Sequence, residues 1–385
     1  MNQSIIKVLI GQRRSGKSML LIDCKAELIT HYSVDEASCI VINKELIEFD
    51  HIQTYKDLYD AVVSYTHIFV DEIQDIKERE KAIRGLQAVW WKDIYITWSN
   101  SHLLAWELAT YLSGRYIALD VYPFDYREFL QVHDLQNTKT SFDLYQEYGG
   151  MPYLSHIWLH SRSKEYLKSV YETIVLHDVV KRYAIRNVDF FQKLMQFIAL
   201  NVWLLFSALT ISNVLAEQNI DIWSGVITEY LSNAQSALYL HGVERFDLRS
   251  KKIFERKQKW YFTDIWIRNC LIWWWVMKHI WWVLENIVFI NLKTHWYTVY
   301  IWERYDKEID FVAEKDGMFL YIQVAYLLES QQTIEREFGN LKAIPNDGLK
   351  YVLSTDAWPR SVHEWIIHMN IWDFLIWLQE KEFVV

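Results

Sequence analysis

The sequence predicts an α/β protein that begins with a doubly wound parallel sheet. Short apolar runs separated by helical stretches indicate buried strands at residues 5–10, 39–43, 67–70, 93–97 and 116–121. Such alternation is typical of a sheet with helices on both faces, where ligands bind at the carboxyl ends of the strands. Two helical patterns within 209–240, and then strands near 308–310 and 322–325, predict a helical part and a smaller second α/β part.

Composition narrows the class of protein. A chain of 385 residues is expected to form two or three domains. Its net charge of −9 argues against a surface that is positively charged all over and binds nucleic acid without selectivity, although a local basic patch is compatible with it. Three widely spaced cysteines form no CxxC pair, so neither a disulfide framework nor a zinc site is expected. The apolar windows at 198–211 and 271–284 are shorter than the ~20 residues of a membrane-spanning helix. Since no secretory signal is visible, we expect a cytoplasmic protein with no membrane partner.

A phosphate-binding motif follows the first strand. It matches GxxxxGK[ST] without a gap and consists of Gly11, Gln12, Arg13, Arg14, Ser15, Gly16, Lys17 and Ser18. The glycines let backbone N–H groups turn inward around phosphates, and the helix that follows adds partial positive charge at its N-terminus. Lys17 is expected to reach the β- and γ-phosphates, and the Ser18 hydroxyl to hold Mg²⁺. The alternative is a plain glycine turn, which the strand before and the helix after disfavour.

A second motif closes the third strand. The apolar run 67–70 ends in Asp71 and Glu72. Asp71 is expected to coordinate Mg²⁺, directly or through water, and Glu72 to act as the base that polarises an attacking water. A solvated acidic strand end is the alternative, but the spacing from the phosphate loop leaves room for one intervening strand. Together the two motifs predict a P-loop NTPase of the ASCE/AAA-like type that binds and hydrolyses ATP.

Three further polar residues are candidates for the same site. The strand 93–97 is expected to deliver Ser99 and Asn100 to its carboxyl edge, where a polar side chain senses the γ-phosphate or orients water. Arg115 precedes the strand 116–121. It is either an arginine finger, acting in cis or in trans, or part of a structural salt bridge.

Many segments carry a resemblance to a known family. Besides the phosphate loop they include FVDEIQ (69–74), LSGRY (112–116), VYPFDYREFL (121–130), YGGMP (148–152), DVVKRYAIRN (178–187), LENIVF (284–289) and KEIDFVAEKDG (307–317). The chain resembles, over nearly its whole length, the AAA-type ATPases that carry a C-terminal DUF4143 region. The resemblance implies an ATPase domain at 1–150, a helical lid and winged-helix domain at 151–262, and a PD-(D/E)xK nuclease-like domain at 263–385.

The middle of the chain contains a candidate DNA contact. Two helical patterns within 209–240 have the layout of a helix-turn-helix. A basic stretch follows and resembles the wing of a winged-helix domain, with Arg249, Lys251, Lys252, Arg256, Lys257 and Lys259. These side chains either contact DNA phosphates or form a solvated hairpin of a protein-contact module.

The nuclease-like part lacks the residues of a nuclease. Such a site needs an Asp, and then a Glu and a Lys two residues apart on the next strand. Here Glu285 lies in the leading helix and Asp310 ends a strand, but Gln323 and Ala325 stand where Glu and Lys are needed. Gln supplies no second negative charge and Ala assists no proton transfer. We therefore expect a nuclease-shaped domain without nuclease chemistry.

The tryptophan content is unusual. The chain has 20 Trp but only 11 Gly, where a usual share of ~7% would give about 27 Gly. Proteins of the family that the chain resembles typically have Gly where this one has Trp98, Trp106, Trp203, Trp266, Trp296, Trp302 and Trp365. Our hypothesis is that these are glycines encoded by UGA in a lineage that reads this codon as Gly. A true aromatic binding surface is the alternative.

The leading interpretation is an ATP-hydrolysing conformational switch that acts on a winged-helix and nuclease-like region. A DNA-binding regulator that holds ATP with little turnover is the runner-up, and an active nuclease is disfavoured by Gln323 and Ala325. The protein partner is not evident from the sequence.

Overall fold

The computed structural model forms two compact units. The first comprises Met1–Tyr122 with Ser236–Leu238, and the second comprises Pro123–Gln235 with Tyr239–Val385. The residues described are 3–89, 91–99, 114–202, 204–217, 219–245, 257–272, 281–304, 307–328, 330–342, 344, 348–356 and 360–380. The first unit thus ends before residue 150, and the division of the remaining chain at 262 stays a prediction.

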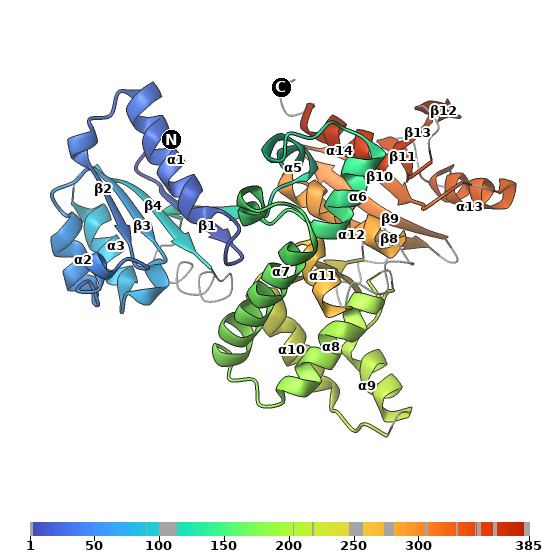
Figure 1. Cartoon of the computed structure of the whole chain (residues 1–385), viewed down its shortest axis with the longest axis horizontal. Helices are drawn as coiled ribbons and strands as arrows, with labels where there is room; N and C mark the ends of the chain where they lie inside the picture. Colours follow the sequence, from blue (N-terminus) through green and yellow to red (C-terminus); the bar gives the residue numbers. More distant parts are fainter. Residues whose placement is uncertain are drawn as a thin grey trace. The chain divides into compact units, whose positions relative to one another are not determined.

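The first unit is built on a five-stranded sheet (Figure 1). Its strands are β1 (Ile6–Gly11), β2 (Cys39–Asn43), β3 (His67–Asp71), β4 (Asp93–Trp98) and β5 (Tyr116–Val121). They are arranged in the order β2-β3-β4-β1-β5, and every neighbouring pair is parallel. This confirms the predicted parallel sheet, and it places β4 between the strand before the phosphate loop and the strand that ends in Asp71.

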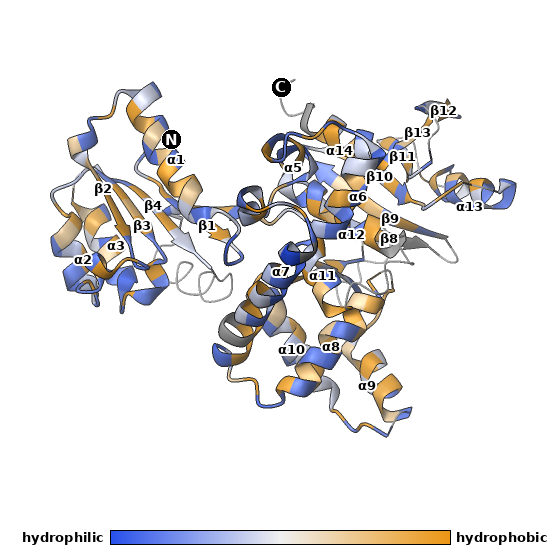
Figure 2. Ribbon diagram, viewed as in Figure 1, coloured by the Kyte–Doolittle hydropathy of each residue, from blue (hydrophilic) through white to orange (hydrophobic). Residues whose placement is uncertain are grey.

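Helices cover both faces of this sheet. Its helices include α1 (Lys17–Tyr32), α2 (Tyr55–Val62) and α3 (Arg79–Ala88), with short 3-10 turns at Glu36–Ser38, Ile47–Phe49 and Ile73–Asp75. One apolar cluster joins α2 and α3 to alternate strand residues, and another joins α1 to the strand residues of opposite parity. Because β1, β3 and β4 are buried on both faces, apolar residues predominate in them, and Figure 2 shows hydrophobic colouring along strands of this sheet.

The second unit begins with helices and a hairpin. The helices are α5 (Tyr126–Val132), α6 (Lys139–Tyr148), α7 (Ser161–Thr173), a π-helical segment (Ile174–Lys181), α8 (Val188–Leu200), α9 (Ala208–Glu217), α10 (Ser224–Ser236) and α11 (Ile265–Leu271), with a 3-10 turn at Pro152–His156. Between α10 and α11, β6 (Leu240–Glu244) pairs antiparallel with β7 (Gln258–Phe262). Both helices predicted within 209–240 are confirmed. Among the helices of the described ranges, none has both the length and the apolar character needed to cross a membrane.

A six-stranded mixed sheet forms the rest of the second unit. Its elements are α12 (Trp281–Thr294), β8 (Thr298–Arg304), β9 (Lys307–Lys315), β10 (Met318–Val324), α13 (Gln331–Lys342), β11 (Leu349–Ser354), β12 (Ser361–His363), β13 (Ile366–Asn370) and α14 (Ile371–Glu380). The strand order is β12-β13-β11-β10-β9-β8. The prediction that Asp310 ends a strand is wrong, because pairing with β8 and β10 continues the strand to Lys315.

Two tryptophans occupy backbone positions that favour glycine. Trp296 has a φ of 65° and follows α12, where its N–H donates to Lys293 O and the next N–H donates to Leu292 O, a Schellman end. Trp365 has a φ of 60° and follows Glu364 with a φ of 46°. These two residues link β12 to β13 as a two-residue hairpin turn, in which the second position is usually Gly. Both observations support the glycine hypothesis; Trp106 and Trp203 lie outside the described residues.

Candidate functional site

The phosphate loop lies between the carboxyl end of β1 and the start of α1. Gly16, with a φ of 96°, caps α1, and Gln12, Ser15 and Lys17 are buried. The loop closes on itself, because Ser15 N–H donates to Gln12 O at 3.2 Å and the Lys17 ammonium donates to the same oxygen at 2.9 Å. The ammonium is thus held inside the loop, where phosphate oxygens are expected.

Gly11 is required by close packing at the start of this loop. A Cβ added there would lie 2.4 Å from Val121 O and 2.7 Å from Ser15 Oγ. Backbone atoms on β5 cannot yield to it as a flexible side chain can. Only glycine therefore allows the loop to leave β1 in this direction.

One hydroxyl organises the acidic end of β3. Thr97, on β4, donates its Oγ1 hydrogen to Asp71 Oδ1 at 2.5 Å and accepts the Glu72 N–H at 2.8 Å. Glu72 has a φ of 53°, so the chain turns sharply after Asp71. All three residues are buried. Thr97 was not identified from the sequence. The available signal was that it is a polar residue near the carboxyl end of β4, the strand next to β3.

Gln74 joins this group from the turn after β3. Its side-chain Nε2 donates to Glu72 Oε2 and, at 3.2 Å, to Ser99 Oγ. Ser99 follows β4 and is buried at the same edge of the sheet, as predicted. Gln74 was missed, since nothing in its sequence context assigns it a role. Asn100 lies outside the described residues.

The polar atoms at this edge suit a phosphorylated ligand and a magnesium ion. Asp71 Oδ2, Ser15 Oγ and both amide atoms of Gln12 are buried without a hydrogen-bond partner in the described part of the chain. Buried polar atoms of this kind are rare unless a ligand or water satisfies them. Ser18 and Asp71 offer the hard oxygen ligands that Mg²⁺ prefers, and Mg²⁺ is commonly held by one or two such protein groups together with phosphates.

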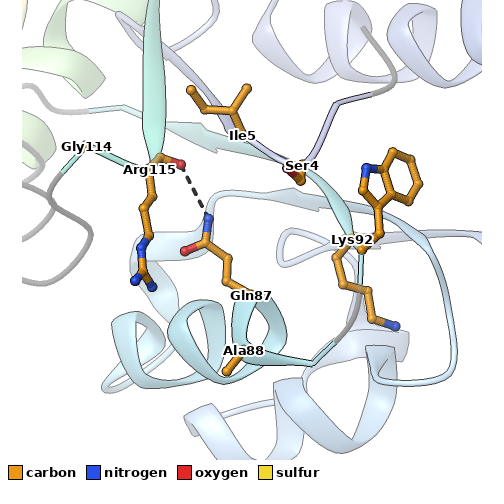
Figure 3. A pocket seen from close by; sticks show the side chains of 8 residues that line it. Ser4, Ile5, Gln87, Ala88, Lys92, Gly114 and Arg115 are labelled. Atoms are coloured by element: carbon orange, nitrogen blue, oxygen red, sulfur yellow. Dashed lines mark hydrogen bonds between the residues drawn. The ribbon is translucent and has the colours of Figure 1, made fainter.

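Arg115 lies at the amino-terminal end of the strands, opposite the end that carries the phosphate loop. It directly precedes β5, and its backbone oxygen accepts hydrogen bonds from Ile6 N–H and Gln87 Nε2 (Figure 3). Six strand residues at ~3.3 Å each separate it from the carboxyl edge, roughly 20 Å away. Of the alternatives for Arg115, an arginine finger acting in cis is therefore excluded; a role in trans and a structural salt bridge stay predictions.

A hollow of about 680 Å³ opens beside Arg115. It is lined by Ser4, Ile5, Gln87, Ala88, Trp91, Lys92, Gly114 and Arg115. These residues precede β1, β4 and β5 or end α3, so the hollow faces away from the phosphate loop. The Lys92 ammonium is engaged there by the backbone oxygens of Val63 and Tyr65.

Comparison with known proteins identifies the family. A family model described as an AAA domain matches residues 3–130. An uncharacterized protein of Haemophilus influenzae is 30% identical over 364 residues, which cover 91% of this chain and 88% of that protein. The chain belongs to the family of this relative. Its first unit is an AAA-type P-loop ATPase domain, in agreement with the predicted fold of the N-terminal part.

Other proteins similar to this AAA protein are more distant. An uncharacterized protein of Methanocaldococcus jannaschii is 28% identical over 353 residues, covering 86% of this chain and 77% of the relative. Among solved structures, a Walker-type ATPase of Pyrococcus abyssi is 16% identical with a TM-score of 0.47, covering 70% of this chain and 91% of the other. The Orc1 protein of Aeropyrum pernix, solved in complex with DNA, is 11% identical with a TM-score of 0.29, covering 69% and 86%.

The region after the AAA domain matches a family other than the one expected. Residues 139–274 match a model described as a domain of unknown function, DUF8612. The DUF4143 assignment, the winged-helix domain and the nuclease-like domain stay predictions.

An ion cluster, buried except for the half-exposed Glu308, lies where the nuclease-like residues were sought. The Lys259 ammonium, on β7, lies 3.1 Å from Glu285 Oε2, 2.8 Å from Glu308 Oε1 and 3.4 Å from Asp310 Oδ1. Tyr261 donates its hydroxyl to Glu285 at 2.9 Å, and Val324 N–H donates to Asp310 Oδ2 at 2.8 Å. Burial raises the pKa values of Glu285 and Asp310. Burial opposes the charge of Lys259 too, but the carboxylates outweigh it and raise its pKa above the usual range.

This cluster corrects one expectation about DNA. Lys259 is 2% exposed, so its ammonium is not available to DNA phosphates. Lys257 is exposed, while the remaining basic candidates, Arg249, Lys251, Lys252 and Arg256, lie outside the described residues. Across the described ranges no group of three or more His, Cys, Asp or Glu side chains is arranged to hold a metal ion.

Proposed function

We propose that this AAA protein binds ATP with Mg²⁺ at the phosphate loop and hydrolyses it. The observation that carries the proposal is the hydrogen bond from Thr97 to Asp71. It fixes one carboxylate oxygen and leaves the other, Oδ2, buried without a partner in the described part of the chain. A carboxylate held in this way, at the sheet edge that also carries the phosphate loop, is suited to anchor a cation.

Each residue of the site has a role in this reaction. The loop's N–H groups and Lys17 bind the β- and γ-phosphates, and Ser18 and Asp71 would hold Mg²⁺, which neutralises phosphate charge when bound. Glu72 accepts a proton from the water whose oxygen attacks the γ-phosphorus. The bond from that phosphorus to the bridging oxygen breaks, and ADP leaves with the electron pair. Asn100, beside Ser99 in the chain, is a further candidate to orient the water.

Steady-state phosphate release and nucleotide binding test this proposal together. Lys17→Ala is expected to abolish turnover and to weaken ATP binding, whereas Glu72→Gln is expected to retain binding and to block hydrolysis. Lys25→Ala is the matched control, because Lys25 lies on the same helix and pairs with Glu36 at the surface. If wild type binds ATP but releases no phosphate, the alternative of an ATP-liganded DNA-binding regulator is supported instead.

The second unit is proposed to respond to the nucleotide. In ATPase switches, contacts of the γ-phosphate and Mg²⁺ hold loops that relax on hydrolysis. The arrangement of α9, α10 and the β6–β7 hairpin supports a winged-helix region, and the Lys259 cluster supports a nuclease-like region without nuclease chemistry. Metal-dependent DNA cleavage that is lost in Asp310→Ala would contradict the second statement.

A further inference from the structure

Gln74 connects two strand ends of the AAA domain through one amide group. It lies in the 3-10 turn Ile73–Asp75, directly after the acidic end of β3. The two hydrogens of its Nε2 are directed to Glu72 Oε2 and to Ser99 Oγ, at the end of β4. A side-chain amide nitrogen has two donor hydrogens, so this contact uses its whole donor capacity.

The backbone around Gln74 is fixed on both sides. Before it, Glu72 N–H is held by Thr97 Oγ1 at 2.8 Å. After it, Asp75 N–H donates to Glu72 O and Ile76 N–H donates to Ile73 O, each at 3.1 Å. Arg79 also donates to the Gln74 carbonyl oxygen at 3.4 Å. The side chain therefore leaves a rigid turn, and its amide reaches Glu72 and Ser99 without a large search of rotamers.

We propose that Gln74 is a positioning residue that orients the Glu72 carboxylate toward the water attacking ATP and ties that orientation to Ser99. The inference rests on the proposed function. A base must lie within hydrogen-bonding reach of the proton it takes, and a displacement of about 1 Å costs about 10²-fold in rate. Ser99 directly follows β4, which pairs with the strand before the phosphate loop, so a shift of that strand end on nucleotide binding is passed to Glu72 through one side chain.

The alternative is that Gln74 only stabilises its turn. A structural role of that kind lowers the stability of the domain and weakens ATP binding together with turnover. A positioning role lowers kcat and leaves the affinity for ATP nearly unchanged, because Glu72 acts on water rather than on the phosphates. The split between kcat and affinity therefore separates the two.

Gln74→Met tests the proposal in the full-length protein, since Met has a similar length and no amide. We expect kcat to fall about 10- to 100-fold, while the dissociation constant of a fluorescent ATP analogue changes by less than about twofold and the melting temperature is retained. Gln53→Met is the matched control. Gln53 Nε2 donates to Asp50 O at 2.6 Å on the surface of the same domain and not to Glu72 or Ser99, so its loss should leave kcat unchanged.

Gln74→Glu supplies a second readout. Two adjacent carboxylates do not ionise independently, so we expect the acidic limb of the kcat–pH profile to move to higher pH. An acidic limb that stays in place would show that the side chain at position 74 does not lie against the Glu72 carboxylate, and it would overturn the positioning role. Unchanged kcat in Gln74→Met, or equal losses of kcat and of ATP affinity, would overturn the role of Gln74 while the proposed function stands. Absence of turnover in wild type would overturn the proposed function and this inference with it.

Discussion

At the scale of single residues, the Thr97 hydroxyl forms hydrogen bonds with both Asp71 and Glu72. Its removal therefore tests how the acidic end of β3 is held in place. Thr97→Val keeps the shape but leaves Asp71 Oδ1 and Glu72 N–H buried without their partner. We expect a loss of about 1–3 kcal/mol in the free energy of unfolding, and a higher Mg²⁺ concentration for half-maximal ATP binding, because Asp71 loses its fixed orientation. Urea unfolding and Mg²⁺ titrations measure the two effects.

Thr97→Ser is the control, since it keeps the hydroxyl and loses only a methyl group. It should retain the Mg²⁺ dependence of wild type. A Thr97→Val variant that binds Mg²⁺ and ATP as wild type does would show that the orientation of Asp71 does not depend on this bond.

Lys259 offers a second prediction at this scale. Its ammonium is the shared partner of the carboxylates of Glu285, Glu308 and Asp310. Removing one partner of a buried ion cluster leaves uncompensated charge, so we expect Lys259→Met to lose about 3–5 kcal/mol of stability. Lys257→Met, two residues earlier on the exposed side, should lose little. Equal urea midpoints for the two variants would contradict a stabilising cluster.

The residues predicted correctly at this scale are those whose role follows from local spacing. Lys17 is defined by the loop that contains it, and Asp71 by the strand that it ends. Thr97 and Gln74 gain their roles from the pairing of β3 with β4 and from a turn conformation, which no local pattern encodes. For Arg115, cis, trans and structural alternatives were left open by the sequence; its position before β5 excludes the one in cis.

At the scale of elements, two connections test the identity of the tryptophans. Trp296 ends α12 and Trp365 turns β12 into β13, both with positive φ. A residue with a Cβ costs roughly 1–2 kcal/mol in this region, so Trp365→Gly is expected to stabilise the protein by about 1 kcal/mol in urea unfolding. Trp260→Gly should destabilise it instead, because Trp260 is buried in β7.

Peptide sequencing by mass spectrometry decides the hypothesis directly. Protein purified from its natural cells should contain Gly at 296 and 365 where the suspect codons are UGA. Trp in those native peptides, or UGG codons at those positions, would contradict the hypothesis. The positive φ values would then be backbone strain at genuine tryptophans.

Element positions were predicted well where a short apolar run is followed by a turn, even for the outer strands of the sheet. The strands 39–43 and 116–121 have the expected bounds, because a short apolar run followed by a turn leaves little choice. The end of β9 was misplaced, since its polar residues Glu308 and Asp310 suggested a strand end, whereas they lie inside the strand as partners of Lys259.

At the scale of the whole molecule, the sequence shows which segments are strands but not their neighbours. The order β2-β3-β4-β1-β5 depends on crossovers that the apolar pattern does not specify. Residues 123–150 belong to the second unit for a similar reason. Tyr126 N–H donates to Asn291 Oδ1 at 3.2 Å, and the ring of Phe142 contacts Trp372. These contacts join residues more than 150 positions apart, beyond the reach of local periodicity.

Coupling between the two units is the prediction that belongs to this scale. Glu72→Gln is expected to hold ATP without hydrolysing it, so hydrogen exchange can be compared between its ATP and ADP complexes. If the nucleotide biases the second unit, amides beyond residue 122 should change their exchange rates by about 5- to 150-fold, which corresponds to a coupling free energy of 1–3 kcal/mol. Lys17→Ala should show no such difference, because it is expected to bind neither nucleotide tightly.

The same coupling must act in both directions if DNA is the partner of the second unit. By linkage, a DNA duplex that binds the ATP state more tightly must raise the affinity for ATP by the same factor. Filter binding across salt concentrations should then give a steep slope that becomes shallower when Lys257 is replaced by Met, because each phosphate contact releases counterions. Exchange differences confined to residues 1–122, together with an ATP affinity that DNA does not alter, would mean that ATP binding and hydrolysis do not affect the second unit.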